Sequence, residues 1–257
     1  TVSDSIVFTG TNWKGIDIQT AGSTIKYARI NGAKNGSYSV KLKGSEVSNS
    51  HIYDSKGLYL EYSSTLNKNK IHDIVNDESI EYGGYGQEST VYGNKIYNTA
   101  SNYWAVKIQG NESSASDLDD AIFRNNELII SALGIYSNGA NTTIEKNTII
   151  KDTLQNSSIG IQINKSSYEN VSSGSSVTFR YNNIGGFDNN VIINGSTPSS
   201  FTNNNFTGTL DVSSQKNIYV QDNGYNEFSS NQVAINMQSN YWGNVPASDI
   251  PNSITDW

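Results

Sequence analysis

Apolar residues recur along this chain in pairs whose members lie five positions apart. Successive pairs start 17 to 35 residues apart, so the spacing within a pair is constant while the intervening segments vary in length. The eleven pairs are Phe8/Trp13, Ile25/Ile30, Val47/Ile52, Leu66/Ile71, Val91/Ile96, Phe123/Leu128, Ile144/Ile149, Phe179/Ile184, Phe201/Phe206, Val220/Tyr225 and Met237/Trp242. A fixed unit repeated with variable insertions is typical of a solenoid, in which each copy packs only against its neighbours.

Inside each pair, the position three residues after the first member is Asn in eight of the eleven copies. The chain holds 35 Asn among 257 residues, so chance would place Asn there about once or twice. In order, this position holds Thr11, Ala28, Ser50, Asn69, Asn94, Asn126, Asn147, Asn182, Asn204, Asn223 and Asn240. Asn tolerates the left-handed backbone of a sharp corner, and stacked amides can hydrogen-bond from one turn to the next. We therefore expect an Asn ladder along one corner of the repeat.

A second element, in which two apolar residues flank one other residue, follows most pairs. Its copies are Ile16/Ile18, Val40/Leu42, Leu58/Leu60, Ile80/Tyr82, Val106/Ile108, Ile161/Ile163, Val191/Ile193 and Leu210/Val212, with a weaker copy at Ile135/Ser137. A period of two indicates short strands with one buried face. Stacked about 4.8 Å apart, such strands predict an all-β parallel β-helix of about eleven rungs. The strands of a β-sandwich or a propeller also alternate apolar and polar residues, but neither fold explains an Asn at the same position in repeat after repeat.

The whole chain, 1–257, is thus expected to be one β-helix domain with rungs over 6–243 and a C-terminal cap or tail at 244–257. Segments such as "LNKNKIHD", "VYGNKIYN", "IEKNTII" and "SNYWGN" resemble the right-handed parallel β-helix repeats of the pectate-lyase-like superfamily. The opening "FTGTNWKGIDI" and the closing "NYWG" are similar to β-helix regions of bacterial and archaeal secreted or cell-surface proteins. The resemblance implies three strands per turn, with the Asn corner joining the second and third. It also implies a substrate cleft over the first-strand face.

The element with the period of two would be that first strand, and its outward residues form the candidate ligand face. Rung by rung they are Asp17, Lys41, Tyr59, Glu81, Lys107, Tyr136, Gln162, Ile192 and Asp211. Long insertions at 72–79, 83–90, 97–104, 109–121, 150–159 and 164–176 are expected to form walls on both sides. Aromatic rings beside charged and amide groups suit sugars, whose C–H faces lie on rings while their hydroxyls need donors and acceptors. The predicted glycan-binding residues are Tyr59, Glu81, Lys107, Tyr136 and Gln162, with Tyr85, Tyr103 and Trp104 from the walls.

A neighbouring column of the same strand holds only small residues. They are Gly15, Ser39, Gly57, Ser79, Ala105, Gly134 and Gly160. We expect this column to leave room for a ligand close to the backbone.

Catalysis on this face is a second possibility, because β-helices of this superfamily include polysaccharide lyases and glycoside hydrolases. A hydrolase needs two carboxylates at a set separation, for which Glu81 with Glu61 or Asp119 are the candidates. A lyase would use Lys107 with Tyr136. A calcium ion could bind clustered oxygens at Glu112, Asp117, Asp119 and Asp120. We expect no other cofactor.

Composition narrows the partner class. The net charge of -7 argues against a nucleic-acid backbone, which needs a basic surface. The absence of Cys excludes disulfides and thiolate chemistry. No segment approaches the roughly 18 consecutive apolar residues of a membrane span. The leading prediction is a carbohydrate-binding, adhesin-like module of a secreted or cell-surface protein, acting beside other domains of a longer parent chain. A stalk without a ligand is a third reading.

Overall fold

The computed structural model describes residues 5–83, 87–109, 120–138, 141–152, 157–164, 177–195, 198–207, 216–221 and 235–255. Across these ranges the chain forms short strands and a single 3-10 helix, Pro251–Ser253. None of the described segments is a helix long and apolar enough to cross a membrane.

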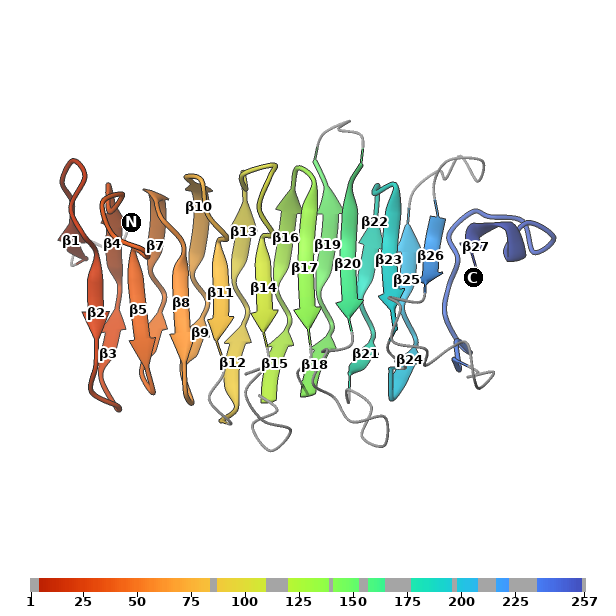
Figure 1. Cartoon of the computed structure of the whole chain (residues 1–257), viewed down its shortest axis with the longest axis horizontal. Coiled ribbons are helices and arrows are strands. Elements are labelled where there is room, and N and C mark those ends of the chain that lie inside the picture. Colours follow the sequence, from red (N-terminus) through yellow and green to blue (C-terminus); the bar gives the residue numbers. More distant parts are fainter. Residues whose placement is uncertain are drawn as a thin grey trace.

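The strands form three parallel sheets, which wind into a coil (Figure 1). Sheet A contains β1 (Ile6–Phe8), β4 (Ala28–Asn31), β7 (His51–Ser55), β10 (Lys70–Ile74), β13 (Lys95–Tyr97), β16 (Glu127–Ile130), β19 (Thr148–Lys151), β22 (Asn183–Gly185) and β25 (Asn205–Thr207). Sheet B contains β2 (Ile16–Ile18), β5 (Val40–Lys43), β8 (Leu58–Glu61), β11 (Ile80–Gly83), β14 (Val106–Gln109), β17 (Leu133–Asn138), β20 (Ile159–Asn164), β23 (Asn189–Asn194), β26 (Lys216–Gln221) and β27 (Ile254–Thr255). Sheet C contains β3 (Thr24–Lys26), β6 (Glu46–Ser48), β9 (Thr65–Asn67), β12 (Ser89–Tyr92), β15 (Asp120–Arg124), β18 (Asn141–Glu145), β21 (Thr178–Arg180) and β24 (Ser200–Thr202).

Each turn runs from sheet C through a corner to sheet A and then to sheet B. In Figure 1 the sheet B strands face the viewer and point downward, the sheet A strands behind them point upward, and successive turns advance to the right. The coil is therefore a right-handed parallel β-helix, as the sequence predicts.

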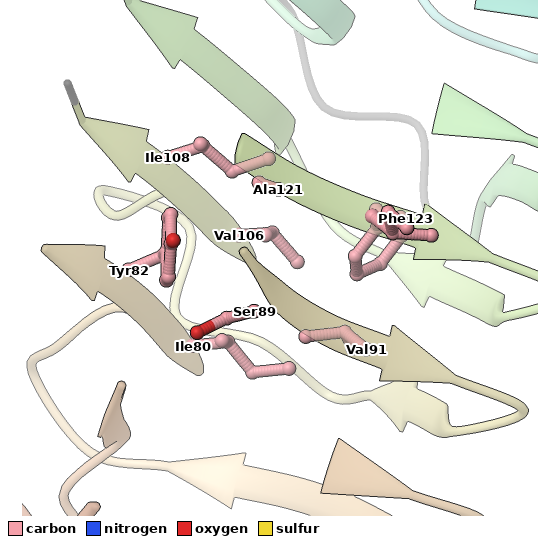
Figure 2. A pocket seen from close by; sticks show the side chains of 9 residues that line it. Ile80, Tyr82, Ser89, Val91, Val106, Ile108, Ala121 and Phe123 are labelled. Atoms are coloured by element: carbon pink, nitrogen blue, oxygen red, sulfur yellow. The ribbon is translucent and has the colours of Figure 1, made fainter. Parts of the chain in front are cut away.

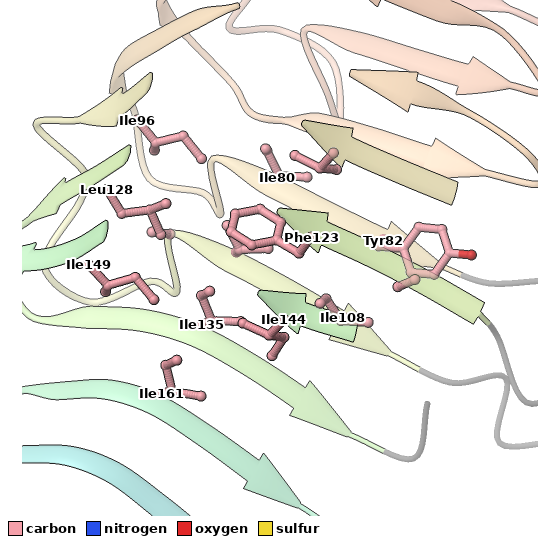
Figure 3. Packing of buried hydrophobic residues seen from close by; sticks show 14 of the residues in the cluster. Ile80, Tyr82, Ile96, Ile108, Phe123, Leu128, Ile135, Ile144, Ile149 and Ile161 are labelled. Carbon is pink, nitrogen blue, oxygen red and sulfur yellow. The ribbon is translucent and has the colours of Figure 1, made fainter. Parts of the chain in front are cut away.

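The strand register confirms most of the predicted repeat. The first members of eight pairs, from Ile25 to Phe201, occupy equivalent positions in adjacent strands of sheet C. Their second members, from Ile30 to Phe206, do the same in sheet A. The side chains at these positions form one continuous apolar core, and the half-buried Ile25 packs against it. Figure 3 shows the core side chains stacked from rung to rung.

Two of the predicted pairs are wrong. Phe8 pairs with Ile30 in sheet A, so it occupies the place of a second member and not of a first. Val220 pairs with Ile193 in sheet B, where Ile218 and Val220 form the element predicted at 210–212. Residues 208–215 and 222–234, which include Leu210, Val212, Asn223 and Tyr225, lie outside the described residues.

The recurrent Asn side chains lie at the corner between sheets C and A and are joined by hydrogen bonds; all described members are buried except the half-buried Asn240. Asn69 Oδ1 accepts from the backbone N–H of Ser50, and each later amide oxygen accepts from the backbone N–H and the Nδ2 of the Asn one rung earlier. The chain of bonds runs Asn69, Asn94, Asn126, Asn147, Asn182, Asn204 and Asn240. The expected left-handed backbone belongs instead to the preceding residue, for example Lys68 at φ 55° and Asn125 at φ 54°. The ladder position therefore selects Asn for its amide, and its neighbour makes the turn.

The C-terminal segment packs against the last described turn. Trp242 stacks on Phe206 with ring centroids 5.2 Å apart, and β27 pairs with β26 through Ile254 and Ile218.

One small apolar cavity of about 10 Å³ lies inside the coil between sheets B and C (Figure 2). Its lining includes Tyr82, Val106, Ile108 and Phe123. That volume is close to the minimum for a single water molecule, so this cavity is a packing defect and not a ligand site.

Candidate functional site

The outer face of sheet B carries the row of residues that the sequence predicts. Adjacent strands place Tyr59, Glu81, Lys107, Tyr136 and Gln162 directly opposite one another, in that order. All five are half-buried. The row continues to Tyr219, which takes the place predicted for Asp211; Asp211 lies outside the described residues.

Glu81 lies at the centre of a polar cluster on this face. Its carboxylate accepts a hydrogen bond of 2.7 Å from the Tyr38 hydroxyl and lies 3.4 Å from Lys107 Nζ. Lys107 Nζ also lies 3.6 Å from Glu78 Oε1. The Tyr38 ring stacks on Tyr59, with centroids 4.5 Å apart. Burial, followed by the contact with Glu81, raises the pKa of the Tyr38 hydroxyl, so it acts as a donor at neutral pH.

Asp77 adds a carboxyl group whose pKa is raised above the ordinary value. Burial and a side-chain hydrogen bond with Glu78 raise the pKa of Asp77 to about 6. The ammonium of Lys56, 3.9 Å away, opposes this shift. The Asp77 Oδ1 atom accepts a hydrogen bond of 3.1 Å from the backbone N–H of Glu78, the next residue in the chain. A protonated carboxyl close to neutral pH can donate a hydrogen bond or act as an acid.

A second set of side chains, made of aromatic rings and amides, lies beside this cluster. The Trp104 ring lies 5.3 Å from the Tyr136 ring at 38°. The Tyr136 hydroxyl accepts a hydrogen bond of 2.9 Å from Asn164 Nδ2, and Gln162 Nε2 donates to Asn164 Oδ1 at 2.9 Å. Flat rings are thus placed next to fixed donors and acceptors.

The carboxylate partners proposed for catalysis are not equivalent. Glu61 is paired with Lys41 at 2.9 Å on the neighbouring column, whereas Glu81 is bound by Tyr38 and Lys107. Because Glu78 and Glu81 both contact Lys107, its ammonium is engaged as an ion-pair partner. Glu81 and Lys107 therefore lie in one cluster, and Glu61 belongs to a separate ion pair.

The column of small residues does not provide room for a ligand, contrary to expectation. Ser39, Ser79 and Ala105 are buried. A Cβ at Gly57 would lie 1.7 Å from the Glu78 carbonyl oxygen, and one at Gly134 would lie 1.9 Å from that of Gly160. The residues are small because adjacent turns approach closely here.

The structure does not describe several of the predicted site residues. Tyr85, Glu112, Asp117 and Asp119 lie outside the described residues, and of Asp120 only the backbone in β15 is described. The half-buried Tyr103 donates its backbone N–H to Ala100 in the wall before β14. Within the described ranges no group of three or more His, Asp or Glu side chains could hold a metal ion.

Sequence reasoning missed Tyr38, Asp77 and Glu78 as parts of the site. Tyr38 lies in the connection that enters β5, and Asp77 and Glu78 lie in the connection that enters β11; no periodicity marks them there. The usable signal was their position, since Asp77 and Glu78 fall inside the predicted wall at 72–79. Comparison of the chain with protein-family models, curated proteins and solved structures finds no match, so the geometry of this face carries the functional argument.

Proposed function

We propose that this β-helix binds a glycan across the outer face of sheet B. The observation that carries the proposal is the alignment, on adjacent rungs of one face, of the Trp104–Tyr136 rings with the cluster around Glu81. Rings supply surfaces for the C–H faces of sugars, and the neighbouring amides and charged groups supply hydrogen-bond partners for hydroxyls.

The setting of this activity is that of an adhesin-like or substrate-targeting module of a secreted or cell-surface protein. Two things support it: the resemblance of the repeats to the pectate-lyase-like superfamily, and a ligand face built on a rigid scaffold. The resemblance is an analogy of fold, and such coils serve many functions. Residues of the face therefore decide between functions.

Alanine substitution of Trp104 and Tyr136, made singly, should weaken binding of the recognised glycan by tenfold or more. Each substitution removes a large contact surface without touching the core. The measurement is binding to a broad glycan array, followed by calorimetry on the glycans found. The matched control is Tyr241→Ala, because that Tyr is 57% exposed and lies near the C-terminal end. Absence of binding to every glycan on the array, without turnover, would favour a stalk.

Polysaccharide hydrolysis is the second candidate, favoured by the raised pKa of Asp77. A general acid must be protonated to act, and the protonated fraction of a group with a pKa of about 6 falls as the pH rises above that value. Sugar release from a polysaccharide should therefore decline above pH 6 and disappear in Asp77→Asn, while glycan binding is kept. Chromatographic analysis of the products measures this. Equal release by wild type and variant would remove Asp77 from the mechanism.

A further inference from the structure

A second surface, on the outer face of sheet A, combines cations in a way that the glycan face does not. Arg29, His51 and Lys70 lie directly opposite one another on β4, β7 and β10. Adjacent strands are about 4.8 Å apart, so the backbones that carry the two permanent cations are separated by roughly 10 Å, with the strand that carries His51 between them. Arg29 and Lys70 are both exposed, and His51 is half-buried.

Neither permanent cation has a carboxylate partner among the described residues. Arg29 donates a hydrogen bond of 3.1 Å to the Tyr53 hydroxyl, and Lys70 lies 5.8 Å from the centre of the Tyr97 ring. The next position along the row, Lys95, is neutralised by Glu127 at 2.8 Å. The uncompensated row is therefore limited to three rungs, on a protein whose net charge is -7.

The nearby acidic groups are already engaged. Asp73 Oδ2 lies 2.6 Å from His72 Nδ1, and its Oδ1 accepts from Asn98 at 3.1 Å. Asp54 is paired with Lys34 at 2.6 Å. His51 in turn shares a hydrogen bond of 2.5 Å with His72, Nε2 to Nε2. The row between Arg29 and Lys70 thus presents positive charge to solvent without an internal counter-ion.

We propose that Arg29, His51 and Lys70 form a binding site for a linear polysaccharide that carries carboxylate or sulfate groups. A chain lying along the axis of the coil can place one anionic group against Arg29 and another against Lys70, with His51 beneath it. This site is independent of the proposed sheet B function, because the two lie on different sheets of the coil.

The aromatic residues beside the row distinguish a polysaccharide from a single-stranded nucleic acid. Tyr53, His72 and Tyr97 stack on one another, with centroids 5.5 and 4.4 Å apart. His72 is covered by the two Tyr rings, and Arg29 and Lys70 lie over the Tyr53 and Tyr97 rings at 5.9 and 5.8 Å from their centroids. These rings are thus already engaged, whereas single-strand binding proteins stack bases on free rings. The site therefore suits a ligand recognised by its charge.

His51 provides a signal that reports on the site. Burial, the neighbouring His72, and then the charges of Lys70 and Arg29 lower the pKa of His51 to about 4, while Asp73 opposes the shift. An anion seated across Arg29 and Lys70 offsets those two cations and favours the imidazolium. Binding should therefore raise the pKa of His51, and by linkage the anion should bind more tightly as the pH falls from 6 to 4.

The test uses the full chain with three oligosaccharide probes of equal length: an oligouronide, a sulfated one and a neutral one. At low salt both anionic probes should bind and the neutral probe should not, and the sulfated probe, whose charge is constant, should bind more tightly at pH 4.5 than at pH 7. The double variant Arg29→Gln/Lys70→Gln should lose tenfold or more in affinity. In NMR titrations the sulfated probe should move the His51 midpoint upward by one pH unit or more.

The matched control is Lys14→Gln/Lys146→Gln, which removes the same charge from two exposed positions outside the row. Equal loss in this control would show attraction without a site and would overturn the proposal. So would unchanged binding in the Arg29/Lys70 variant, or a single-stranded oligonucleotide that binds as tightly as the polysaccharides. The Trp104→Ala variant should keep the polyanion binding, so failure of the sheet B proposal is seen separately.

Discussion

Asn126→Leu should be among the most destabilising single substitutions in this protein, with a loss of about 3–5 kcal/mol in the free energy of unfolding. Asn126 is buried, and its Oδ1 accepts from both the N–H and the Nδ2 of Asn94. Its Nδ2 donates to Val91 O, Arg124 O and Asn147 Oδ1. Leu has a similar size but makes none of these bonds, so the ladder is interrupted and the Asn94 backbone N–H loses its acceptor. A buried polar group without a partner costs about 1–3 kcal/mol.

Thermal and denaturant unfolding measure this effect, and amide hydrogen exchange locates it. Because each turn of a solenoid contacts only its neighbours, faster exchange should be concentrated in β12, β15 and β18. The control Asn102→Ala removes an exposed amide from a wall segment and should change stability by less than about 0.5 kcal/mol. Equal effects of the two substitutions would mean that the ladder contributes nothing special.

The coil itself could be predicted from the sequence because its constraint is local and repeated. Each turn must point at least one apolar side chain inward from every strand and must close one corner, so apolar residues five positions apart with Asn between them recur wherever the turn is regular. The prediction failed where the chain enters and leaves the regular stack. Phe8 lies in β1, which has no preceding sheet C strand among the described residues, and Val220 lies in β26, which follows residues outside the described ranges.

The candidate site was only half predictable. Alternation along sheet B fixes which residues point outward, so Tyr59, Glu81, Lys107, Tyr136 and Gln162 could be placed in one row. Which neighbours complete the site depends on connections of unequal length, for which no pattern gives a register. The sheet A row was missed for another reason. Its cations belong to separate repeats, and only the register shows that they are consecutive and that neither Arg29 nor Lys70 has a carboxylate partner among the described residues.

The small column illustrates a different limit of sequence reasoning. A run of Gly, Ser and Ala at equivalent positions indicates limited space, but the pattern does not say what occupies that space. In the structure it is the backbone of the next turn: the N–H of Leu58 donates to the Ser79 carbonyl at 3.0 Å, directly beside Gly57. Close approach of two turns, not an open groove, explains the composition.

Gly57→Val should therefore damage both the scaffold and the glycan face. The new Cβ would lie 1.7 Å from the Glu78 carbonyl oxygen and 3.1 Å from that of Ser79, and both are backbone atoms of the next turn. Relief requires β8 and β11 to separate, so we expect a loss of about 3 kcal/mol or more in stability, at the upper end of the cost of overpacking. The displaced Glu78 would also leave Lys107, so glycan affinity should fall by tenfold or more in the protein that is still folded.

Gly10→Val provides the matched control for this prediction. Gly10 is exposed, and a Cβ there would meet only the Trp13 side chain, at 3.3 Å, and no backbone atom of a neighbouring turn. Unfolding by denaturant should show a small change for Gly10→Val and a large one for Gly57→Val, and calorimetry at a temperature where both are folded should show weakened glycan binding only in the latter. Normal stability of Gly57→Val would mean that the turns tolerate separation. Weakened stability with unchanged glycan affinity would instead mean that the position of Glu78 does not affect ligand binding. The rings of Trp104 and Tyr136 would then be the part of the face that binds.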